Sequence, residues 1–337
     1  MRPPNDRKWI EAVINHREMA VPYNFMFSPV SLQIAEQRYG SPIADAINLP
    51  IRMTSPKSIK PLYADPSIFG PEAIDEYGVK WSTNKIDRGA PIGPVLKEPS
   101  LAGYRFPDPG LPYRFEDIGL WCEKQKEHYR IIWVGDLWER ATFMRGMENL
   151  LIDTVYNPEF VIELLSGITD YILQTMEILF ERFEFEAIAL SDDYGTQKGM
   201  LISPDAWRKF IKPFLWKIYS YAQKNNKKIF QHSCGNIIPV IPDLIELGLD
   251  ILHPIQPEAM DIFYLKKEFG MDLCFCGGIR TQDLLVSGTP QQVRDEVKKL
   301  KDIMGKNGGY ILEPGITIQS DVPAENLFAM IDEAMNL

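Results

Sequence analysis

From residue 130 onward, short apolar segments alternate with amphipathic segments, and this rhythm constrains the fold more than any other feature. The apolar segments have the length and composition of buried strands and span 130–135, 186–191, 227–232, 249–254, 272–277 and 309–314. Apolar residues recur at helical spacing in the intervening segments, for example 203–225 and 289–307. Strands that alternate with helices favour a parallel sheet. With one more strand at 20–27, the pattern predicts a single (β/α)8 TIM barrel over residues 1–337.

The N-terminal third departs from this rhythm. Residues 5–16 carry apolar positions at helical spacing and predict an N-terminal helical extension, and Ser28 followed by Pro29 favours a helix start. Residues of about 50–112 are Pro-rich and show little periodicity, which indicates an irregular insertion packed on the barrel. An open doubly wound sheet is the alternative fold, but no G-x-G-x-x-G motif follows a predicted strand.

Charge and composition exclude several classes of protein. The net charge is −10, so the chain lacks the basic surface that a nucleic-acid-binding protein needs. Four cysteines in 337 residues do not form a disulfide framework. No segment has the length of a membrane span, and the N-terminus does not resemble a signal peptide, so we expect a cytoplasmic protein with reduced thiols.

Cysteine and histidine residues gather at the carboxyl ends of the predicted strands, where TIM barrels place their active sites. His232 and Cys234 lie two residues apart, so they share one side of an extended strand. Imidazole and thiolate are preferred zinc ligands, and a catalytic site has three protein ligands and one open position. His232 and Cys234 are therefore predicted zinc ligands, although a buried thiol beside a core histidine is the alternative.

A third ligand must come from another strand. Cys276 lies nearer to the carboxyl end of its strand than Cys274, so Cys276 is the expected ligand and Cys274 the alternative. Glu258 could supply an oxygen ligand, or it could be a helix N-terminal glutamate. The paired C-x2-C or C-x2-H motifs of structural zinc sites are absent from the sequence, which favours a catalytic site.

Acidic, polar and aromatic residues surround these positions in the sequence. Asp192 and Asp193 directly follow the strand at 186–191, and one of them is expected to orient a zinc-bound imidazole as part of the catalytic machinery. The predicted substrate-binding residues lie on strand ends and the loops that follow them, and they are Tyr23, Asn24, Tyr194, Gln197 and His253. The nearby Trp133 and Trp138 suit a flat substrate or an ordinary barrel core.

Several long segments resemble the uroporphyrinogen decarboxylase superfamily. They are DDYGTQKGMLISPDAWRKFIKPFLWKI at 192–218, QHSCGNIIPVIPDLIELGLDILHPIQPEAMDIFYLKKEFG at 231–270, CGGIRTQDLLVSGTPQQVRDEVKKL at 276–300, and GGYILEPGITIQSDVPAENLFAMIDEA at 308–334. The resemblance covers roughly residues 186–335 and is looser towards the N-terminus. It implies either a metal-free decarboxylase or a zinc-dependent methyltransferase that acts with a corrinoid.

The motifs favour the second kind of enzyme. Decarboxylases of this superfamily hold substrate carboxylates with an arginine-bearing segment near the first strand, whereas PYNFMFSP at 22–29 has no arginine. The corrinoid-linked branch carries the His-x-Cys-Gly motif that begins at His232. Its coenzyme M methyltransferases have a further cysteine after the final Pro-Gly, where this chain has Ile316.

The resemblance therefore implies zinc-dependent methyl transfer between a small substrate and a corrinoid (cobalamin) carried by a partner protein. A methoxylated aromatic compound undergoing O-demethylation is the expected substrate. Methyl transfer to a thiol such as coenzyme M and metal-free decarboxylation are the alternatives. The direction of transfer stays open, and so does the oligomeric state, for which a homodimer is one expectation.

Overall fold

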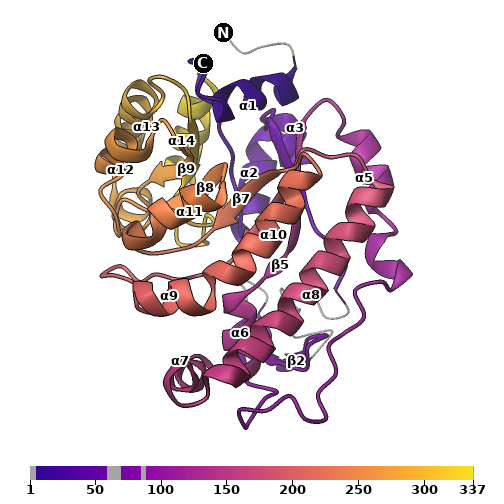
Figure 1. Cartoon of the computed structure of the whole chain (residues 1–337). Coiled ribbons are helices and arrows are strands. Elements are labelled where there is room, and N and C mark those ends of the chain that lie inside the picture. Colours follow the sequence, from indigo (N-terminus) through magenta and orange to yellow (C-terminus); the bar gives the residue numbers. More distant parts are fainter. Residues whose placement is uncertain (1–4, 59–69, 85–88, 337) are drawn as a thin grey trace.

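A curled parallel sheet of seven strands forms the centre of the computed structural model, which describes residues 5–58, 70–84 and 89–336. The strand order is β1-β5-β6-β7-β8-β9-β10 (Figure 1). The strands are β1 (Ile51–Thr54), β5 (Tyr129–Asp136), β6 (Ala187–Ser191), β7 (Lys228–His232), β8 (Ile251–Ile255), β9 (Cys274–Ile279) and β10 (Tyr310–Pro314). The six strands predicted from residue 130 onward are thus confirmed, within two residues at each end.

The edges of this sheet differ in part from the prediction. Residues 20–27 form only isolated parallel bridges, from Tyr23 to Leu312 and from Phe27 to Ile318, and no regular strand. These bridges lay the segment along β10, in the place of a further barrel strand. Residues 51–54 were predicted to lie in the irregular insertion, but they form β1 and pair with β5. The architecture is therefore a TIM-barrel-like half-barrel of seven parallel strands.

Helices flank the sheet and complete the α/β architecture. Those before β5 are α1 (Asp6–Ile14), α2 (Pro29–Tyr39), α3 (Ile43–Ala46), the short 3-10 helix η1 (Pro112–Phe115) and α5 (Ile118–Lys124). Those between β5 and β7 are α6 (Trp138–Arg145), α7 (Met147–Tyr156), α8 (Pro158–Arg182), α9 (Pro204–Phe210) and α10 (Lys212–Lys224). Those after β7 are η2 (Ile238–Val240), α11 (Ile241–Leu247), α12 (Ile262–Phe269), the π-helical turn η3 (Thr281–Leu285), α13 (Pro290–Met304) and α14 (Ala324–Met335). The predicted helix starts are confirmed at Asn5 and Ser28, whose side chains cap α1 and α2.

The two ends of the sheet are covered by different parts of the chain. Trp9 and Ile10 of α1 pack in one buried cluster with Tyr129 and Ile251, which begin β5 and β8, so α1 closes the amino-terminal end. A small antiparallel sheet of β2 (Glu72–Ile74), β3 (Lys80–Ser82) and β4 (Pro91–Gly93) belongs to the predicted insertion. Figure 1 shows β2, α6 and α7 at the end opposite α1. The carboxyl ends of the strands therefore lie beneath the insertion.

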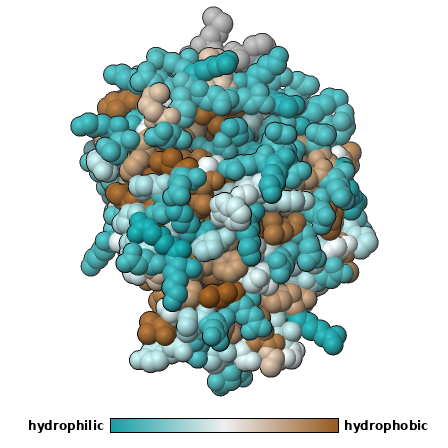
Figure 2. Space-filling model, viewed as in Figure 1, coloured by the Kyte–Doolittle hydropathy of each residue, from teal (hydrophilic) through white to brown (hydrophobic). Residues whose placement is uncertain are grey.

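The outer surface follows from the amphipathic helices. In the face shown in Figure 2, hydrophilic residues dominate and hydrophobic residues are scattered among them. Exposed apolar side chains include Val155, Tyr156 and Trp216 on the outer helices. In the described part of the chain, no helix combines the length and the apolar character needed to cross a membrane.

Candidate metal centre and adjoining cavity

The loops after β6 and β7 are fastened to each other, and this places the predicted residues at one spot. The backbone N–H of Cys234 donates to Asp193 Oδ1 at 2.8 Å, and the N–H of Tyr194 donates to Ser233 Oγ at 3.1 Å. The two backbones approach so closely at Gly195 and Gly235 that neither position has room for a Cβ atom. Gly235 also has a φ of 81°, which favours glycine. The local sequence thus brings a carboxylate against the His-x-Cys motif.

Asp193, His232 and Cys234 form a compact group of three potential metal ligands. His232 Nε2 lies 3.5 Å from Cys234 Sγ and 3.4 Å from Asp193 Oδ1. All three side chains are partly accessible. Sulfur, nitrogen and oxygen ligands therefore converge at the carboxyl ends of β6 and β7.

These separations fit a tetrahedral zinc ion. Zn–S bonds of about 2.3 Å and Zn–N or Zn–O bonds of about 2.1 Å place a sulfur about 3.6 Å from a nitrogen, and a nitrogen about 3.4 Å from an oxygen. The observed separations from His232 Nε2, 3.5 Å to the sulfur and 3.4 Å to the oxygen, lie within about 0.1 Å of these values. The residues present are thus suited to zinc by both chemistry and spacing.

A second group lies directly behind the first and is fully buried. It contains His253, Cys276 and Glu313. Cys276 Sγ donates to Glu313 Oε2 at 2.9 Å, and Asn24 Nδ2 donates to the same oxygen at 3.0 Å. His253 Nδ1 lies 2.9 Å from His232 Nδ1, so one imidazole of each group joins the two.

The shifts in pKa reflect this crowding. Burial opposes protonation of His232, but Cys234 and Asp193 outweigh it and raise the pKa of the imidazole. Burial also opposes ionisation of Asp193, but His232 and the Cys234 N–H lower its pKa to about 2. Burial and the neighbouring Glu313 carboxylate raise the pKa of Cys276, which favours its thiol form. The first group therefore favours a charged carboxylate, and the second a neutral thiol.

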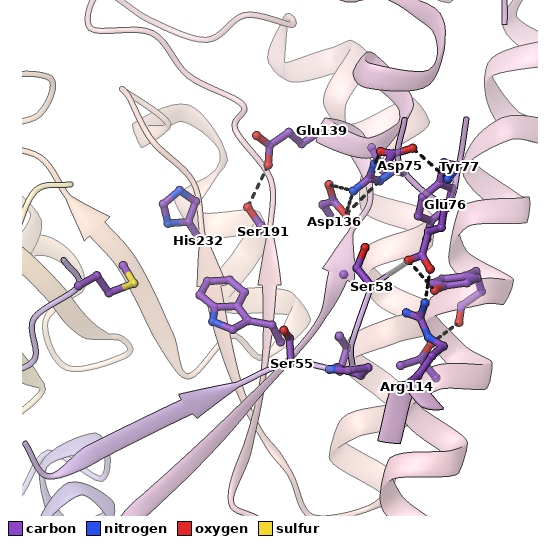
Figure 3. Close-up of a pocket in the computed structure, with 18 of the residues that line it drawn as sticks. Ser55, Ser58, Asp75, Glu76, Tyr77, Arg114, Asp136, Glu139, Ser191 and His232 are labelled. Carbon is purple, nitrogen blue, oxygen red and sulfur yellow. Dashed lines mark hydrogen bonds and ion pairs between the residues drawn. The ribbon is translucent and has the colours of Figure 1, made fainter. Parts of the chain in front are cut away.

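A cavity of about 430 Å³ adjoins the first group, and His232 forms part of its wall (Figure 3). The cavity lies between the strand ends and the insertion. Its walls include the rings of Tyr77, Trp133 and Tyr171. Its volume is in the range of small-molecule sites, which is about 300–1,000 Å³. The candidate metal centre thus borders a cavity suited to a small, ring-containing molecule.

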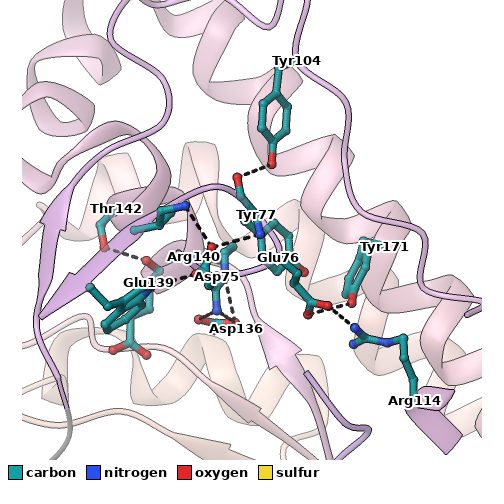
Figure 4. A network of polar contacts seen from close by, with 12 residues as sticks. Asp75, Glu76, Tyr77, Tyr104, Arg114, Asp136, Glu139, Arg140, Thr142 and Tyr171 are labelled. Carbon is teal, nitrogen blue, oxygen red and sulfur yellow. Dashed lines mark hydrogen bonds and ion pairs between the residues drawn. The ribbon is translucent and has the colours of Figure 1, made fainter. Parts of the chain in front are cut away.

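Ion pairs neutralise the two arginines of this cavity (Figure 4). Arg140 contacts Asp75 at 2.9 Å and Asp136 at 3.1 Å, and Arg114 contacts Glu76. The cavity wall also contains Glu139, which accepts a hydrogen bond from Ser191 at 3.0 Å. Four carboxylates thus face two arginines, so the described part of the wall offers no free cation to an anionic substrate.

Other predicted site residues have buried partners within the fold. Asp192 is fully buried and accepts hydrogen bonds from the N–H groups of Leu137 and Glu139 and from the hydroxyl of Tyr194. Burial raises the pKa of Asp192. Tyr23 donates its hydroxyl to a backbone carbonyl at Ile47. The contacts of Asp192 connect the loop after β6 with the start of α6.

Gln197, Glu258 and Cys274 lie apart from both the cavity wall and the two metal-ligand groups. Gln197 is exposed and donates to Gln282 at 2.6 Å. Glu258 accepts the N–H groups of Thr281 at 2.7 Å and Gln282 at 3.0 Å, the position of an acidic cap at a helical turn. Cys274 lies in the apolar cluster with α1. Neither Glu258 nor Cys274 belongs to the two metal-ligand groups found among the described residues.

The polar wall of the cavity was not predicted from the sequence. Asp75 and Glu76 come from the insertion, whose irregular sequence gives no periodic signal. Asp136 lies at the end of a predicted strand and is followed by Glu139 and Arg140. This position was the one available indication in the sequence that acidic residues line the cavity.

Comparisons with known proteins agree with this architecture. The family model for uroporphyrinogen decarboxylase (URO-D) matches residues 83–337. A methylated-thiol–coenzyme M methyltransferase of Methanosarcina mazei is 23% identical over 195 residues, which cover 57% of this chain and 48% of the relative, so the match spans about half of that protein. The structure of a methyltransferase from Methanosarcina mazei has the same fold, with a TM-score of 0.73 over 98% of both chains at 18% identity. Since the family model matches more than half of the chain, this protein belongs to the uroporphyrinogen decarboxylase family.

Proposed function

We propose that this protein is a zinc-dependent methyltransferase that moves a methyl group between a small substrate and a corrinoid carried by a partner protein. The observation that carries this proposal is the ligand group at His232, whose separations match a tetrahedral zinc site and which borders a cavity of about 430 Å³. The match to a methyltransferase of Methanosarcina mazei supports the same type of reaction.

In this proposal Asp193, His232 and Cys234 hold the metal. Asp193 is then the third ligand, a role for which the sequence predicted Cys276. When bound, Zn²⁺ supplies a Lewis acid for the heteroatom that carries the methyl group. The backbone N–H of Cys234 fixes the Asp193 carboxylate, and the aromatic rings of the cavity orient the substrate. This set leaves a fourth coordination position for the substrate heteroatom.

A methoxylated aromatic compound is the proposed substrate, and O-demethylation is the proposed reaction. Tyr77, Trp133 and Tyr171 provide apolar ring surfaces in the cavity. A ligand set with one thiolate and one carboxylate is harder than a set with two thiolates, and hard sites favour oxygen ligands. An ether oxygen therefore suits this site better than it would suit a site with two cysteines.

Methyl transfer to or from a thiol is the second candidate function. The Methanosarcina relative named for a methylated thiol favours this function. Ile316 speaks against it, because it stands where the coenzyme M methyltransferases of the superfamily have their last cysteine. Decarboxylation of a porphyrinogen is disfavoured because the substrate carboxylates would need cations, and Arg114 and Arg140 are already paired with acidic side chains.

A methyl-transfer assay tests the proposal. Zinc-loaded protein is mixed with cob(I)alamin, free or bound to a corrinoid protein, and with methoxylated aromatics, methylamines or methylated thiols. We expect the absorption spectrum of methylcobalamin to appear with a methoxylated aromatic. Cys234→Ser should lose at least 100-fold in rate (about 3 kcal/mol), whereas Cys122→Ser, a buried thiol on α5, should not. Activity without zinc, or equal activity in Cys234→Ser, would contradict the proposal.

A further inference from the structure

We propose that Glu313 and His253 form a polar relay that sets the tautomer of His232, and that Cys276 takes part as a thiol donor and not as a metal ligand. This inference rests on the proposed function, because it takes His232 as a zinc ligand through Nε2. It assigns a positioning role to three buried side chains behind the metal centre.

The first step is the contact between the two imidazoles. His232 Nδ1 and His253 Nδ1 lie 2.9 Å apart, a hydrogen-bond distance. Between two neutral rings, one Nδ1 must carry the proton and the other must accept it. The accepting ring then has its own proton on Nε2, so only the donating ring has an Nε2 lone pair for a metal. The pair can therefore bind a metal through one Nε2 atom, unless the accepting ring is deprotonated.

The surroundings of the two Nε2 atoms decide which ring donates. His253 Nε2 is buried and has no hydrogen-bond partner among the described residues, and the same is true of Glu313 Oε1. These two atoms lie 3.7 Å apart, somewhat longer than an ordinary hydrogen bond. A lone pair on His253 Nε2 would be repelled by a buried carboxylate oxygen, whereas an N–H there is attracted to that oxygen. His253 therefore carries its proton on Nε2 and accepts from His232.

His232 then has the complementary tautomer. Its proton lies on Nδ1, and its Nε2 lone pair points to Cys234 Sγ and Asp193 Oδ1. Metal-binding histidines commonly donate their second N–H to a fixed acceptor, which orients the ring and increases its basicity. Here the acceptor is a second imidazole, and Glu313 fixes that imidazole in turn.

The remaining oxygen of Glu313 explains the role of Cys276. Glu313 Oε2 accepts from Asn24 Nδ2 at 3.0 Å and from Cys276 Sγ at 2.9 Å. Sulfur and oxygen ligands on one zinc ion would lie about 3.6 Å apart, so the shorter contact is that of a thiol donating to a carboxylate. Among the described ion pairs, Glu313 has His253 as its only partner. The buried carboxylate thus depends on these three donors.

The tautomers give a direct spectroscopic test. The chain has four histidines, so long-range ¹H–¹⁵N spectra of zinc-loaded protein labelled with ¹⁵N-histidine can resolve each ring. His16→Gln and His128→Gln assign the two outlying rings. We expect a proton on Nδ1 alone for His232 and on Nε2 alone for His253. A proton on Nδ1 of His253, or on both of its nitrogens, would overturn the relay.

Substitutions give an independent test. Cys276→Ser retains a donor to Glu313, so it should bind one zinc per chain with an affinity within about twofold of the unsubstituted protein. Glu313→Gln should weaken zinc binding about 10–100-fold, whereas Glu333→Gln, a buried glutamate on α14, should not. A large loss of zinc in Cys276→Ser, or a second zinc per chain that Cys276→Ser removes, would overturn the inference.

The same measurements separate this inference from the proposed function. Absence of zinc from the unsubstituted protein, or zinc that Cys234→Ser does not remove, would contradict the metal site itself. Zinc that depends on Cys234 while His253 has the opposite tautomer would contradict the relay alone.

Discussion

Gly235→Ala should damage the metal centre through the backbone and not through a ligand. A Cβ atom at this position would overlap the carbonyl carbon of Gly195 and lie 2.5 Å from its oxygen and 2.6 Å from the nitrogen of Thr196. Non-bonded heavy atoms settle at separations of about 3.5 Å. The loops after β6 and β7 would therefore have to separate by about 1 Å.

The structure gives the size of the effect. The φ of 81° at Gly235 costs an alanine about 1–2 kcal/mol. Overlap in a well-packed interior costs about 1–3 kcal/mol more. We expect a loss of about 2–5 kcal/mol in the free energy of unfolding. Metal sites tolerate shifts of about 0.2 Å in ligand distances, so a displacement of about 1 Å at the neighbouring Cys234 should also abolish zinc binding.

Two matched variants separate these contributions. Gly103 has a φ of 79°, and no described atom lies within 4 Å of the place that its Cβ would take, so Gly103→Ala carries the backbone cost alone. Gly195 lacks a positive φ, but its Cβ would lie 2.7 Å from the nitrogen of Asn236, so Gly195→Ala carries the overlap alone. Denaturant unfolding and zinc content are measured for all three variants. If Gly235→Ala matches Gly103→Ala in stability and retains zinc, the reasoning from loop contact is wrong.

Two further predictions concern residues outside the metal centre. Glu258→Ala should lower the free energy of unfolding by about 1 kcal/mol, because the N–H groups of Thr281 and Gln282 lose their acceptor. The zinc content of this variant should stay unchanged. A loss of zinc would show that Glu258 is a ligand after all. Burial opposes ionisation of Asp243, but Arg208 outweighs burial and lowers the pKa of this carboxyl group. The charged carboxylate therefore stabilises the folded protein above the unfolded pKa, which is near 4. This stabilisation is lost as the pH falls through the lower pKa of the folded state. Asp243→Asn should therefore reduce the acid sensitivity of stability in denaturant unfolding between about pH 6 and pH 3, and an unchanged pH profile would contradict this account.

The six strands from β5 to β10 were predictable because their buried residues form continuous apolar segments bounded by turns. β1 was not, because Ile51–Thr54 has four residues, contains the buried Arg52, and lies next to Pro-rich sequence. Arg52 is stabilised by contacts with Leu49 and Asp45 that only the folded chain supplies. The pairing with β5 depends on tertiary contacts, which a single short segment does not encode.

The site shows the same division between local and tertiary information. The two-residue spacing of His232 and Cys234 predicted that they lie together, and the structure places their ligand atoms 3.5 Å apart. The sequence predicted Cys276 as the third ligand, and Asp193 or Asp192 as a residue that orients a zinc-bound imidazole. The strand order favours Asp193, since β6 is adjacent to β7 whereas β9 is two strands away. Adjacency of consecutive strands therefore supports the proposed role of Asp193 as a ligand.

Ile316 lies beside the cavity wall in the chain. Ile316 is 40% exposed and follows β10, and the next residue, Thr317, lines the cavity together with Met26 and Trp133. A cysteine at position 316 would bring a thiolate from the β10 side, whereas Asp193 brings its carboxylate from the β6 side, away from β10. If Asp193, His232 and Cys234 hold zinc as proposed, a substrate in the cavity would approach the metal past His232, the residue of this group that lines the cavity wall. An aromatic ether bound in the cavity would then have its oxygen on the side of His232, as the proposed O-demethylation requires.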